Sequence, residues 1–324
     1  MNEYIIRKLK DEKYQYYKVN DKKDKILNKI LNKITLNKIS KIYIPPAYKN
    51  VKIYLNSNIL ATGIDSAGRK QYIYSANMKM KREQKKYNQI YKLSKNINKL
   101  KKKINKDLLI KEFTKDKLIA LILKIMDLCN FRTGSKKYEL KYGSYGLTTL
   151  HKNHVKISKD SVEIDFIGKK RVKNNCIIKN KVVQDIIKKV YNLSNNDNSY
   201  IFSIVYKGKD ITINIKDLND YLEYFNVTCK DLRTWNANII FLKNFKKELN
   251  NIEFLKYSDL KIRKKLIRSA IKNTAESLHH TPTICKSSYI FKNIIEKIEE
   301  NTNLYDKIKM HNNEDLLIYF LQKI

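Results

Sequence analysis

Hydrophobic and polar residues alternate along the first part of the chain, up to about residue 80. The runs YQYYKV, KIYIP, VKIYL and RKQYIY repeat apolar or aromatic residues with a period near two, which is typical of half-buried strands. Turn-forming residues separate the runs, among them Pro45, Pro46, Gly63 and Gly68. The pattern predicts a small antiparallel sheet with short helical pieces between its strands.

After this region the apolar period lengthens to that of a helix. In TKDKLIALILKIMDLCNFRTG, residues 114–134, the apolar side chains fall on one helical face: Leu118, Leu121, Ile122, Ile125 and Cys129. We expect Gly134 to end this helix, which places Arg132 at its end. Further helices are expected over 181–193, 215–225, 230–249, 258–278 and 312–324.

The stretch from residue 154 to residue 178 returns to strand-like runs. Turns at Lys159-Asp160 and at Gly168–Arg171 separate these runs, which predicts a small hairpin sheet inside a helical region. We therefore predict an α+β protein. Residues 1–80 form a β-rich N-terminal domain, and residues 81–324 form a larger, mainly helical domain that carries the hairpin sheet.

Charge changes the picture most. The 324 residues carry 68 Lys and Arg against 32 Asp and Glu, a net charge of +36. A surplus of this size predicts a nucleic-acid partner, because bound cations release phosphate counterions. Abundant Lys, Asn, Ile and Tyr also indicate an AT-rich coding sequence, which explains part of the lysine excess. Residues 79–103 are the most cationic stretch and fit either a solvated helix face or a strap along phosphates.

Four scattered cysteines, Cys129, Cys176, Cys229 and Cys285, form no C-x-x-C pair. We interpret them as reduced thiols, without a zinc site or a disulfide framework. Neither a metal nor a cofactor is expected. No apolar run reaches the ~18 residues of a membrane span, and MNEYIIRKLK lacks a signal-peptide core. The expectation is a soluble, intracellular protein with no membrane partner.

Only eight of the basic residues are arginines, so each arginine is a candidate for planar oxyanion binding, which lysine does poorly. A second candidate is HHTPTICKSSYI, where Pro282 suits the first position of a helix and Thr281 suits its cap. His280 then lies in the corner before the helix, with Tyr289 two turns along. Since helical side chains lean toward the N-terminus, we expect a phosphate-sized gap between imidazole and phenol.

These stretches together resemble the poxvirus-type, type IB DNA topoisomerases. The resemblance is carried by GIDSAGRKQYIY, FRTGSKKY, YGLTTLHKNHVKIS, IDFIGKKRV, CKDLRTW, IKNTAE and HHTPTICKSSYI, in the order and at the spacings of that family. It covers most of the chain. It implies the family's two-domain fold and the relaxation of supercoiled DNA by transient single-strand cleavage and religation, without ATP or metal.

Carried over residue by residue, the resemblance implies a catalytic set. Tyr289 would be the nucleophile that forms a 3′-phosphotyrosyl link. Arg132 and Arg233 would bind the non-bridging phosphate oxygens, and His280 would donate to them as well. Lys169 would be the general acid for the departing 5′-oxygen. The chemistry needs such groups, because fixed cations stabilise the spreading negative charge and a basic alkoxide must be protonated as it leaves.

The resemblance also implies DNA contacts. Gln71, Tyr72 and Tyr74 would face the major groove, where amides read adenine edges. Lys137 and Tyr138 would touch the duplex from the catalytic domain. A further residue, Lys230, would lie beside the site. The implied partner is double-stranded DNA, held by a monomer that closes as a clamp. A viral origin would place the enzyme in the host-cell cytoplasm, at virus factories, or in the virion.

Four positions depart from the family's pattern. His279 stands where a small residue is usual, and Ser287 and Ser288 replace bulkier or more cationic residues. Ser135 occupies a position where a lysine is expected. Two alternatives remain. A tyrosine recombinase shares the catalytic logic but usually has His where this chain has Lys230, and a non-catalytic basic DNA-packaging protein would not need the full set.

Overall fold

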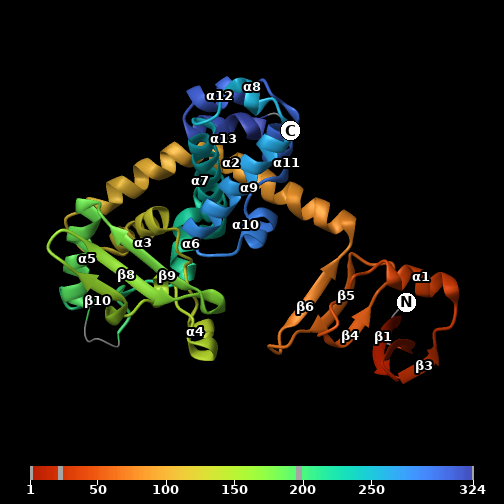
Figure 1. Ribbon diagram of the computed structural model, residues 1–324. Helices are drawn as coiled ribbons and strands as arrows, with labels where there is room; N and C mark the ends of the chain where they lie inside the picture. The colour runs from red at the N-terminus through yellow and green to blue at the C-terminus, as the bar shows by residue number, and fades with distance from the viewer. Residues whose placement is uncertain (1–2, 21–24, 195–198, 323–324) are drawn as a thin grey trace. The chain divides into compact units, whose positions relative to one another are not determined.

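The structure, a computed structural model, describes residues 3–20, 25–194 and 199–322. It divides into two compact units, Met1–Lys86 and Tyr87–Ile324, each described here by itself (Figure 1). The division falls inside the long helix α2 (Ala76–Leu108), which also contains the boundary we expected after residue 80. The first unit is built on a sheet and the second is mainly helical, so the predicted α+β class is confirmed.

The first unit is a six-stranded antiparallel sheet in the order β3-β2-β1-β4-β5-β6. Helix α1 (Lys33–Ser40) lies between β3 and β4 in the chain and is capped by the Asn32 side chain. The strands are β1 (Glu3–Lys10), β2 (Lys13–Asn20), β3 (Lys25–Lys29), β4 (Lys49–Ile53), β5 (Ile59–Ile64) and β6 (Lys70–Tyr74).

The alternating runs give most of this sheet but not all of it. The run KIYIP, residues 41–45, is wrong as a strand, because this segment is an irregular loop. Its backbone does not pair with a strand: the Arg7 guanidinium donates to the carbonyl oxygens of Ile44 and Pro45, at 3.2 and 3.1 Å, and to that of Tyr48 at 2.9 Å. One rare arginine thus has a structural role.

The second unit contains most of the helices. Its strands are β7 (Val155–Ile157), β8 (Val162–Ile167) and β9 (Lys173–Ile178) in one antiparallel sheet, and the hairpin β10 (Ser203–Tyr206) with β11 (Lys209–Thr212). The predicted hairpin sheet is confirmed by β7–β9. Three short 3-10 helices are η1 (Leu147–Thr149), η2 (Lys152–His154) and η3 (Lys169–Arg171).

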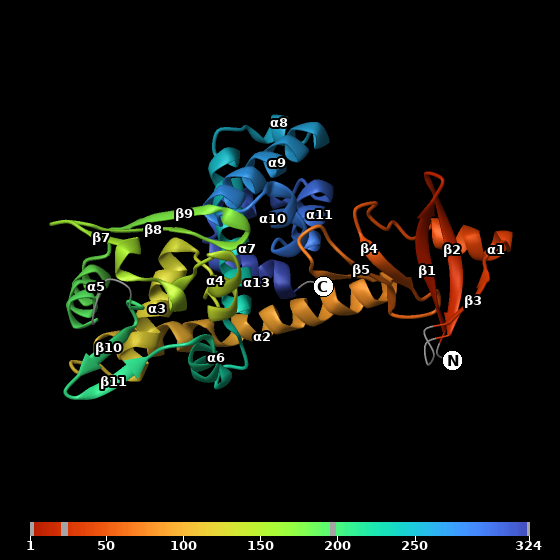
Figure 2. The same ribbon diagram turned by 90° about the horizontal axis from the view of Figure 1, so that it is seen from below.

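Its α-helices after α2 are α3 (Lys115–Cys129), α4 (Lys136–Tyr142), α5 (Lys181–Leu193), α6 (Ile215–Glu223), α7 (Cys229–Leu249), α8 (Phe254–Tyr257), α9 (Leu260–Ser277), α10 (Pro282–Ser288), α11 (Lys292–Glu300), α12 (Leu304–Met310) and α13 (Asn313–Gln322). Apart from α4, which has no buried residue, these helices contribute side chains to one continuous core. Figure 2 shows α2 running past α3 and α7, and residues of these three helices line a common cavity.

The end of α3 differs from the prediction in a way that matters for the site. The helix stops at Asn130, which adopts the left-handed conformation with φ of 54°, a role that Asn tolerates. Gly134, the expected stop, lies four residues further on with φ of 92°. A Cβ built on Gly146 would lie 2.5 Å from the Gly134 backbone. The two glycines therefore let the Arg132 segment pass close to residues 146–148.

The cysteine prediction is wrong for two of the four residues. Cys129 and Cys176 form a disulfide, with Cα atoms 5.6 Å apart across 47 residues of sequence. The pairing arises because β9 packs against the C-terminal end of α3, a contact that cysteine spacing does not reveal. Cys229 and Cys285 are free thiols and are buried.

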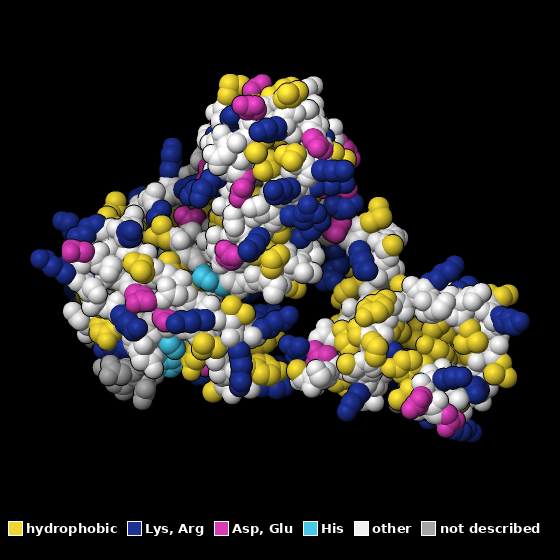
Figure 3. All heavy atoms as spheres, viewed as in Figure 1, with side chains coloured by type: hydrophobic (Ala, Val, Ile, Leu, Met, Phe, Trp, Pro, Cys, Tyr) yellow, Lys and Arg dark blue, Asp and Glu magenta, His cyan; other side chains and the backbone are white. Residues whose placement is uncertain are grey.

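Figure 3 shows lysine and arginine side chains outnumbering acidic ones on the visible face of each unit. Across the described residues, no helix combines the length and apolar content that crossing a bilayer requires.

Candidate active site

The corner between α9 and α10 holds the two histidines. The Thr281 side chain accepts from the Ile284 amide and Pro282 opens α10, as predicted from the sequence. The helix ends at Ser288, so Tyr289 is its C-terminal cap rather than a residue within it. His279 has φ of 55°, a left-handed conformation that favours glycine. The family-like preference for a small residue at this position therefore has a conformational reason.

The Tyr289 phenol meets Arg132. The Arg132 Nη2 donates to the Tyr289 hydroxyl oxygen at 3.2 Å. Arg132 lies in the extended segment after α3, whose backbone is fixed from the other side: the Leu147 amide donates to the Arg132 carbonyl at 2.9 Å, and the Thr148 amide donates to that of Thr133 at 2.7 Å. Residues 157 positions apart in the sequence are thereby joined.

Arg233 lies under the tyrosine ring. It projects from α7 and is only 6% exposed, and its guanidinium carbon is 5.4 Å from the Tyr289 ring centroid. Its Nη1 donates to the Asn130 carbonyl, and its Nη2 donates to the Leu278 carbonyl at 2.6 Å. One guanidinium thus connects the end of α3, the end of α9 and the tyrosine.

His280 is stacked on Tyr289, with ring centroids 4.9 Å apart and an interplanar angle of 13°. The expectation of a phosphate-sized gap between imidazole and phenol is therefore wrong, because two parallel rings at this distance are in contact.

The charges around Tyr289 alter its acidity. Burial raises the pKa of the phenol, but the positive charges of Arg233 and Arg132 outweigh burial, and the pKa of Tyr289 is lowered from its ordinary value. For Arg233 itself, burial and then the neighbouring Arg132 lower the pKa of the guanidinium. In the described part of the chain, neither arginine forms an ion pair with a carboxylate.

The two histidines share a shift of their pKa values in the same direction. Burial, followed by the charges of Arg233 and Arg132, lowers the pKa of His280 to about 4. Burial also lowers the pKa of His279. Both ring nitrogens of His280 are buried and have no hydrogen-bond partner among the described residues. Buried polar atoms usually have partners, so this imidazole is an exception among the buried side chains of the second unit.

The contacts described above bring together four of the five predicted catalytic residues. The fifth, Lys169, is exposed in the turn η3 between β8 and β9. Next to it, Lys170 and Arg171 adopt the left-handed backbone conformation, with φ of 62° and 58°. Lys230, expected beside the site, is exposed in the first turn of α7, one helical turn before Arg233.

Sequence reasoning missed a residue that holds the tyrosine in place. Asn238 of α7 is fully buried. Its Nδ2 donates to the Tyr289 carbonyl at 3.0 Å, and its Oδ1 accepts from the Phe291 amide at 3.0 Å. The signal in the sequence is weak: a polar residue five positions after Arg233, on a helix whose neighbouring positions are apolar.

The expected DNA contacts of the first unit lie on its edge strand β6. The Gln71 side-chain nitrogen donates to Asp65 Oδ2 at 2.8 Å, so this amide already has a partner. Tyr72 is 45% exposed and stacks on Tyr74 at 6.3 Å, with an interplanar angle of 17°. Arg82 lies 4.3 Å from the Tyr74 ring centroid. This face offers aromatic rings and cations to a partner.

The expected contacts of the second unit lie on the short helix α4. Lys137 and Tyr138 are both exposed in its first turns, and the Tyr138 and Tyr142 rings are 5.6 Å apart. Ser135, which departs from the family's pattern, is the N-terminal cap position of α4, although its side chain makes no capping hydrogen bond.

A metal site has no support within the ranges that the structure describes, where no three His, Cys, Asp or Glu side chains gather in a ligand geometry.

The fold and the clustered arginine, histidine and tyrosine side chains define an enzyme that acts on phosphodiesters through a tyrosine. The family model described as "Eukaryotic DNA topoisomerase I, catalytic core" matches residues 75–316. The DNA topoisomerase 1B of Acanthamoeba polyphaga mimivirus is 31% identical over 99% of this chain and 94% of its own length. The DNA topoisomerase 1B of Vaccinia virus (strain Copenhagen) is 28% identical over 76% of this chain and 75% of its own.

The chain therefore belongs to the type IB DNA topoisomerase family, and its relatives are the viral, poxvirus-type members. It is an ATP-independent DNA topoisomerase that relaxes supercoiled DNA by tyrosine-mediated cleavage and religation. A solved XerH site-specific recombinase bound to its difH substrate shares 15% identity and a TM-score of 0.39, over 65% of this chain and 51% of that one.

Proposed function

We propose that Tyr289 is the nucleophile of this topoisomerase, and that Arg132, Arg233, His280 and Lys169 complete its active site. The observation that carries the proposal is the meeting of two arginines at one phenol: Arg132 donates to the hydroxyl at 3.2 Å, and Arg233 lies 5.4 Å from the ring centroid. Their charges lower the pKa of Tyr289, which favours loss of the proton during attack.

The charge balance supports a phosphate at this place. Two guanidinium groups share the site, and among the described residues no carboxylate pairs with either. Burying charges without a counterion is costly. A phosphodiester at the edge of the His280–Tyr289 stack would supply the missing negative charge, and both arginines would stabilise the added charge of the transition state.

In the proposed reaction, the Tyr289 oxygen attacks phosphorus, gives its proton to water and forms a 3′-phosphotyrosyl ester, while the bond from phosphorus to the 5′-oxygen breaks. Lys169, on the exposed turn η3, delivers a proton to that 5′-oxygen. Religation is the reverse reaction, so the phosphodiester energy is kept and no ATP is consumed.

We also propose that a single chain binds the duplex as a clamp. Tyr72, Tyr74 and Gln71 would contact DNA from the first unit, and Lys137, Tyr138 and Lys230 would do so from the second. Exposed aromatic rings and cations on β6 and α4 support these roles. The viral relatives support action in the cytoplasm of an infected cell or in the virion.

An SDS quench of the enzyme with supercoiled plasmid, in EDTA and without ATP, tests the assignment. We expect relaxed plasmid and protein attached to a 3′ end, with the attachment mapped to Tyr289 by mass spectrometry. Attachment at another tyrosine would overturn the assignment of the nucleophile. A sedimentation measurement of the enzyme on a short duplex tests the clamp, for which a 1:1 complex is expected and a higher assembly would contradict the monomer.

A further inference from the structure

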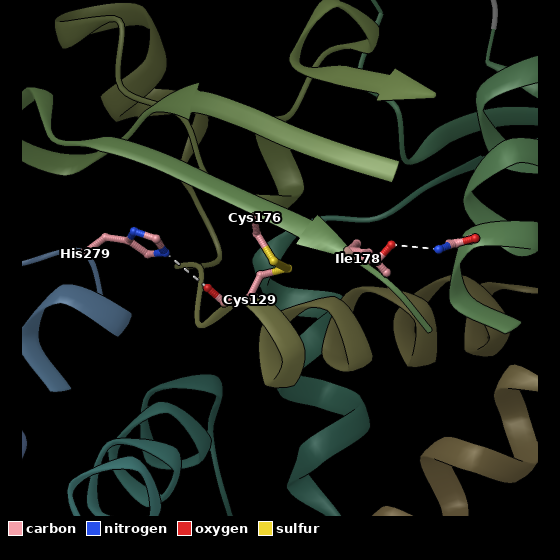
Figure 4. The surroundings of a disulfide bond; sticks show 5 residues. Cys129, Cys176, Ile178 and His279 are labelled. Atoms are coloured by element: carbon pink, nitrogen blue, oxygen red, sulfur yellow. Dashed lines mark hydrogen bonds between the residues drawn. A yellow bond between two sulfur atoms is a disulfide. The ribbon is translucent and has the colours of Figure 1, made fainter. Parts of the chain in front are cut away.

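The disulfide between Cys129 and Cys176 joins the two segments that carry the proposed catalytic cations. Cys129 is the last residue of α3, three positions before Arg132. Cys176 lies in β9, the strand that follows the turn of Lys169. Figure 4 shows the bond bridging the helix end and the strand, with His279 reaching the same helix end from the α9–α10 corner.

The helix end at Cys129 is also held by residues of the active site. A His279 ring nitrogen lies 3.3 Å from the Cys129 carbonyl, and the Arg233 Nη1 donates to the next carbonyl, that of Asn130. Phe131, the residue before Arg132, packs against two further rings. Its ring centroid is 4.8 Å from that of Phe166 in β8 and 5.4 Å from that of His279. These contacts fix the helix end and both arginines without the crosslink, so its reduction frees the sheet side rather than the helix end.

On the sheet side, a displacement of Cys176 would reach the turn that carries Lys169. Cys176 pairs with Ile164 in the β8–β9 ladder, and the turn that closes this ladder is fixed by the Gly168 amide, which donates to the Val172 carbonyl at 2.8 Å. The Asn174 side chain donates to that same carbonyl at 2.8 Å. Because the ladder is continuous from Cys176 to the turn, the crosslink sets where Lys169 stands relative to Arg132.

We propose that the Cys129–Cys176 disulfide is a positioning crosslink that holds the Lys169 turn in register with the Arg132 segment, and that its reduction slows strand cleavage by displacing Lys169. The inference rests on the proposed role of Lys169 as general acid. Cys129 and Cys176 touch neither substrate nor reacting atoms, so they are positioning residues.

The redox step is an ordinary thiol–disulfide exchange. A thiolate of a small dithiol attacks the Cys176 sulfur, which is the more accessible one, since Cys129 is only 3% exposed and Cys176 is partly exposed. Cys129 leaves as a thiolate and takes up a proton, and the second thiol of the reductant releases Cys176. Two electrons pass to the protein and the dithiol becomes a disulfide. A disulfide oxidant such as oxidised glutathione reverses the exchange.

The free cysteines do not compete. Cys229 and Cys285 are buried, and burial raises the pKa of each thiol to about 12, so neither supplies a thiolate near neutral pH. Unfolding exposes every thiol to an alkylating reagent. Alkylation of the unfolded protein should label two thiols before reduction, those of Cys229 and Cys285, and four thiols after it. Four labelled thiols in the oxidised enzyme would overturn the proposal at once.

The decisive measurement is the single-turnover cleavage rate of the full-length enzyme, oxidised or treated with dithiothreitol, on two substrates. One is an ordinary duplex, and the other carries sulfur in place of the bridging 5′-oxygen. A thiolate leaves without needing a proton, because the pKa of a thiol is near ~8.5. We expect reduction to slow cleavage of the oxygen substrate about ten- to a hundredfold, because a small misplacement of a catalytic group has an effect of about that size. The cleavage rate of the sulfur substrate should be almost unchanged.

Two variants serve as controls. The double variant Cys129→Ser/Cys176→Ser should behave like the reduced enzyme and be insensitive to dithiothreitol. Cys229→Ser keeps the crosslink and should respond like the wild type. Circular dichroism of each reports whether the fold persists. Equal slowing on both substrates, or no slowing on either, would overturn the crosslink proposal.

Lys169→Ala separates this failure from failure of the proposed function. If Lys169 is the general acid, this variant is slow on the oxygen substrate and is rescued by sulfur in both redox states. A Lys169→Ala enzyme without rescue would refute the general acid itself. A rescued Lys169→Ala enzyme beside a wild type that ignores dithiothreitol would refute the crosslink alone.

Discussion

Two arginine–tyrosine pairs in the second unit have nearly the same geometry and opposite consequences. Arg233 lies 5.4 Å from the Tyr289 ring centroid, and Arg263 lies 5.5 Å from that of Tyr257. Both arginines project from helices and are 6% and 5% exposed. Yet the pKa of Tyr289 is lowered, whereas burial raises the pKa of Tyr257 to about 12.

The two guanidinium groups differ in whether all of their nitrogens have hydrogen-bond partners. Arg263 donates through Nη1 to the Tyr257 and Ser258 carbonyls, each at 2.8 Å, and through Nε and Nη2 to the Glu299 carbonyl, at 3.1 and 2.9 Å. Arg233 keeps a buried Nε with no partner among the described residues, and a second arginine, Arg132, lies beside it.

The comparison separates a structural arginine from one placed for an anion. This lysine-rich chain contains both kinds of arginine. A lysine can replace neither, because its ammonium group lacks the planar set of donors that binds several carbonyls or two phosphate oxygens. Burial and a nearby ring do not distinguish them. A guanidinium nitrogen without a partner and a second guanidinium beside the first do, and these features occur at Tyr289 and not at Tyr257.

The largest expected effect comes from removing each phenol oxygen. Tyr289→Phe should abolish both plasmid relaxation and the SDS-trapped covalent complex, because no nucleophile remains, while duplex binding by gel shift stays near wild type. Tyr257→Phe is the matched control. Its hydroxyl is buried and unpaired among the described residues, so removing it is close to neutral, and relaxation should persist. Residual relaxation by Tyr289→Phe would show that another nucleophile acts.

The arginines should respond next most strongly, and in different assays. Arg233→Lys should slow single-turnover cleavage about 10²–10³-fold, the usual loss for one transition-state donor, because an ammonium cannot reach two carbonyls and a phosphate together. Arg263→Lys should leave the cleavage rate at 25 °C within a few fold. It should lower the free energy of unfolding by about 1–3 kcal/mol, since buried carbonyls lose their donors.

Cleavage rates and urea unfolding curves on both lysine variants check this contrast. If Arg263→Lys lost as much catalytic rate as Arg233→Lys while remaining folded, the distinction between structural and anion-binding arginines would be wrong.

The sequence predicts those features of the site that depend on residues close together in the chain, and it misses those that depend on residues far apart. The Thr281 cap, Pro282 and the β7–β9 hairpin sheet are confirmed, because short-range patterns determine them. The meeting of Arg132 with Tyr289 was expected only through family resemblance. No local pattern encodes a contact across 157 residues.

The errors have the same origin. The helix stop at Asn130 rather than Gly134 depends on which residue takes the left-handed conformation, and both residue types tolerate it. The disulfide depends on how β9 packs on α3, and the stacked rings of His280 and Tyr289 replace the expected gap. Asn238 was missed because its value lies in two backbone partners that only the fold supplies.

A smaller effect should distinguish the rings that lie beside the two tyrosines. Tyr257 has Tyr305 as its neighbour, at 5.3 Å, whereas Tyr289 is stacked on the titratable His280. The pKa of His280 is lowered from 6.5 to about 4 in the folded protein. Between these pH values the unfolded chain binds a proton that the folded chain does not, so stability is lost as pH falls from 6.5 toward 4.

For His280 this linkage amounts to at most about 3 kcal/mol, and His280→Asn should remove it. The measurement is urea unfolding of wild type and variant at pH 7, 5.5 and 4.5. Because His154 and His279 also have lowered pKa values, only the difference between the two proteins is assigned to His280. Identical pH dependence in both would mean that this imidazole titrates normally.

The smallest expected effect is a shift in the pH dependence of cleavage, which tests the lowered pKa of Tyr289. On the sulfur-bridged substrate, where leaving-group protonation is not needed, the wild-type rate should rise with pH and level off below pH 10, the ordinary pKa of a tyrosine. In Arg132→Gln the phenol loses one of its two neighbouring charges, so the inflection should move to higher pH. Arg263→Lys, whose guanidinium faces the other tyrosine, should leave the inflection unchanged. An inflection that stays in place in Arg132→Gln would mean that Arg233 alone sets the acidity of Tyr289, and that the second arginine serves the phosphate rather than the phenol.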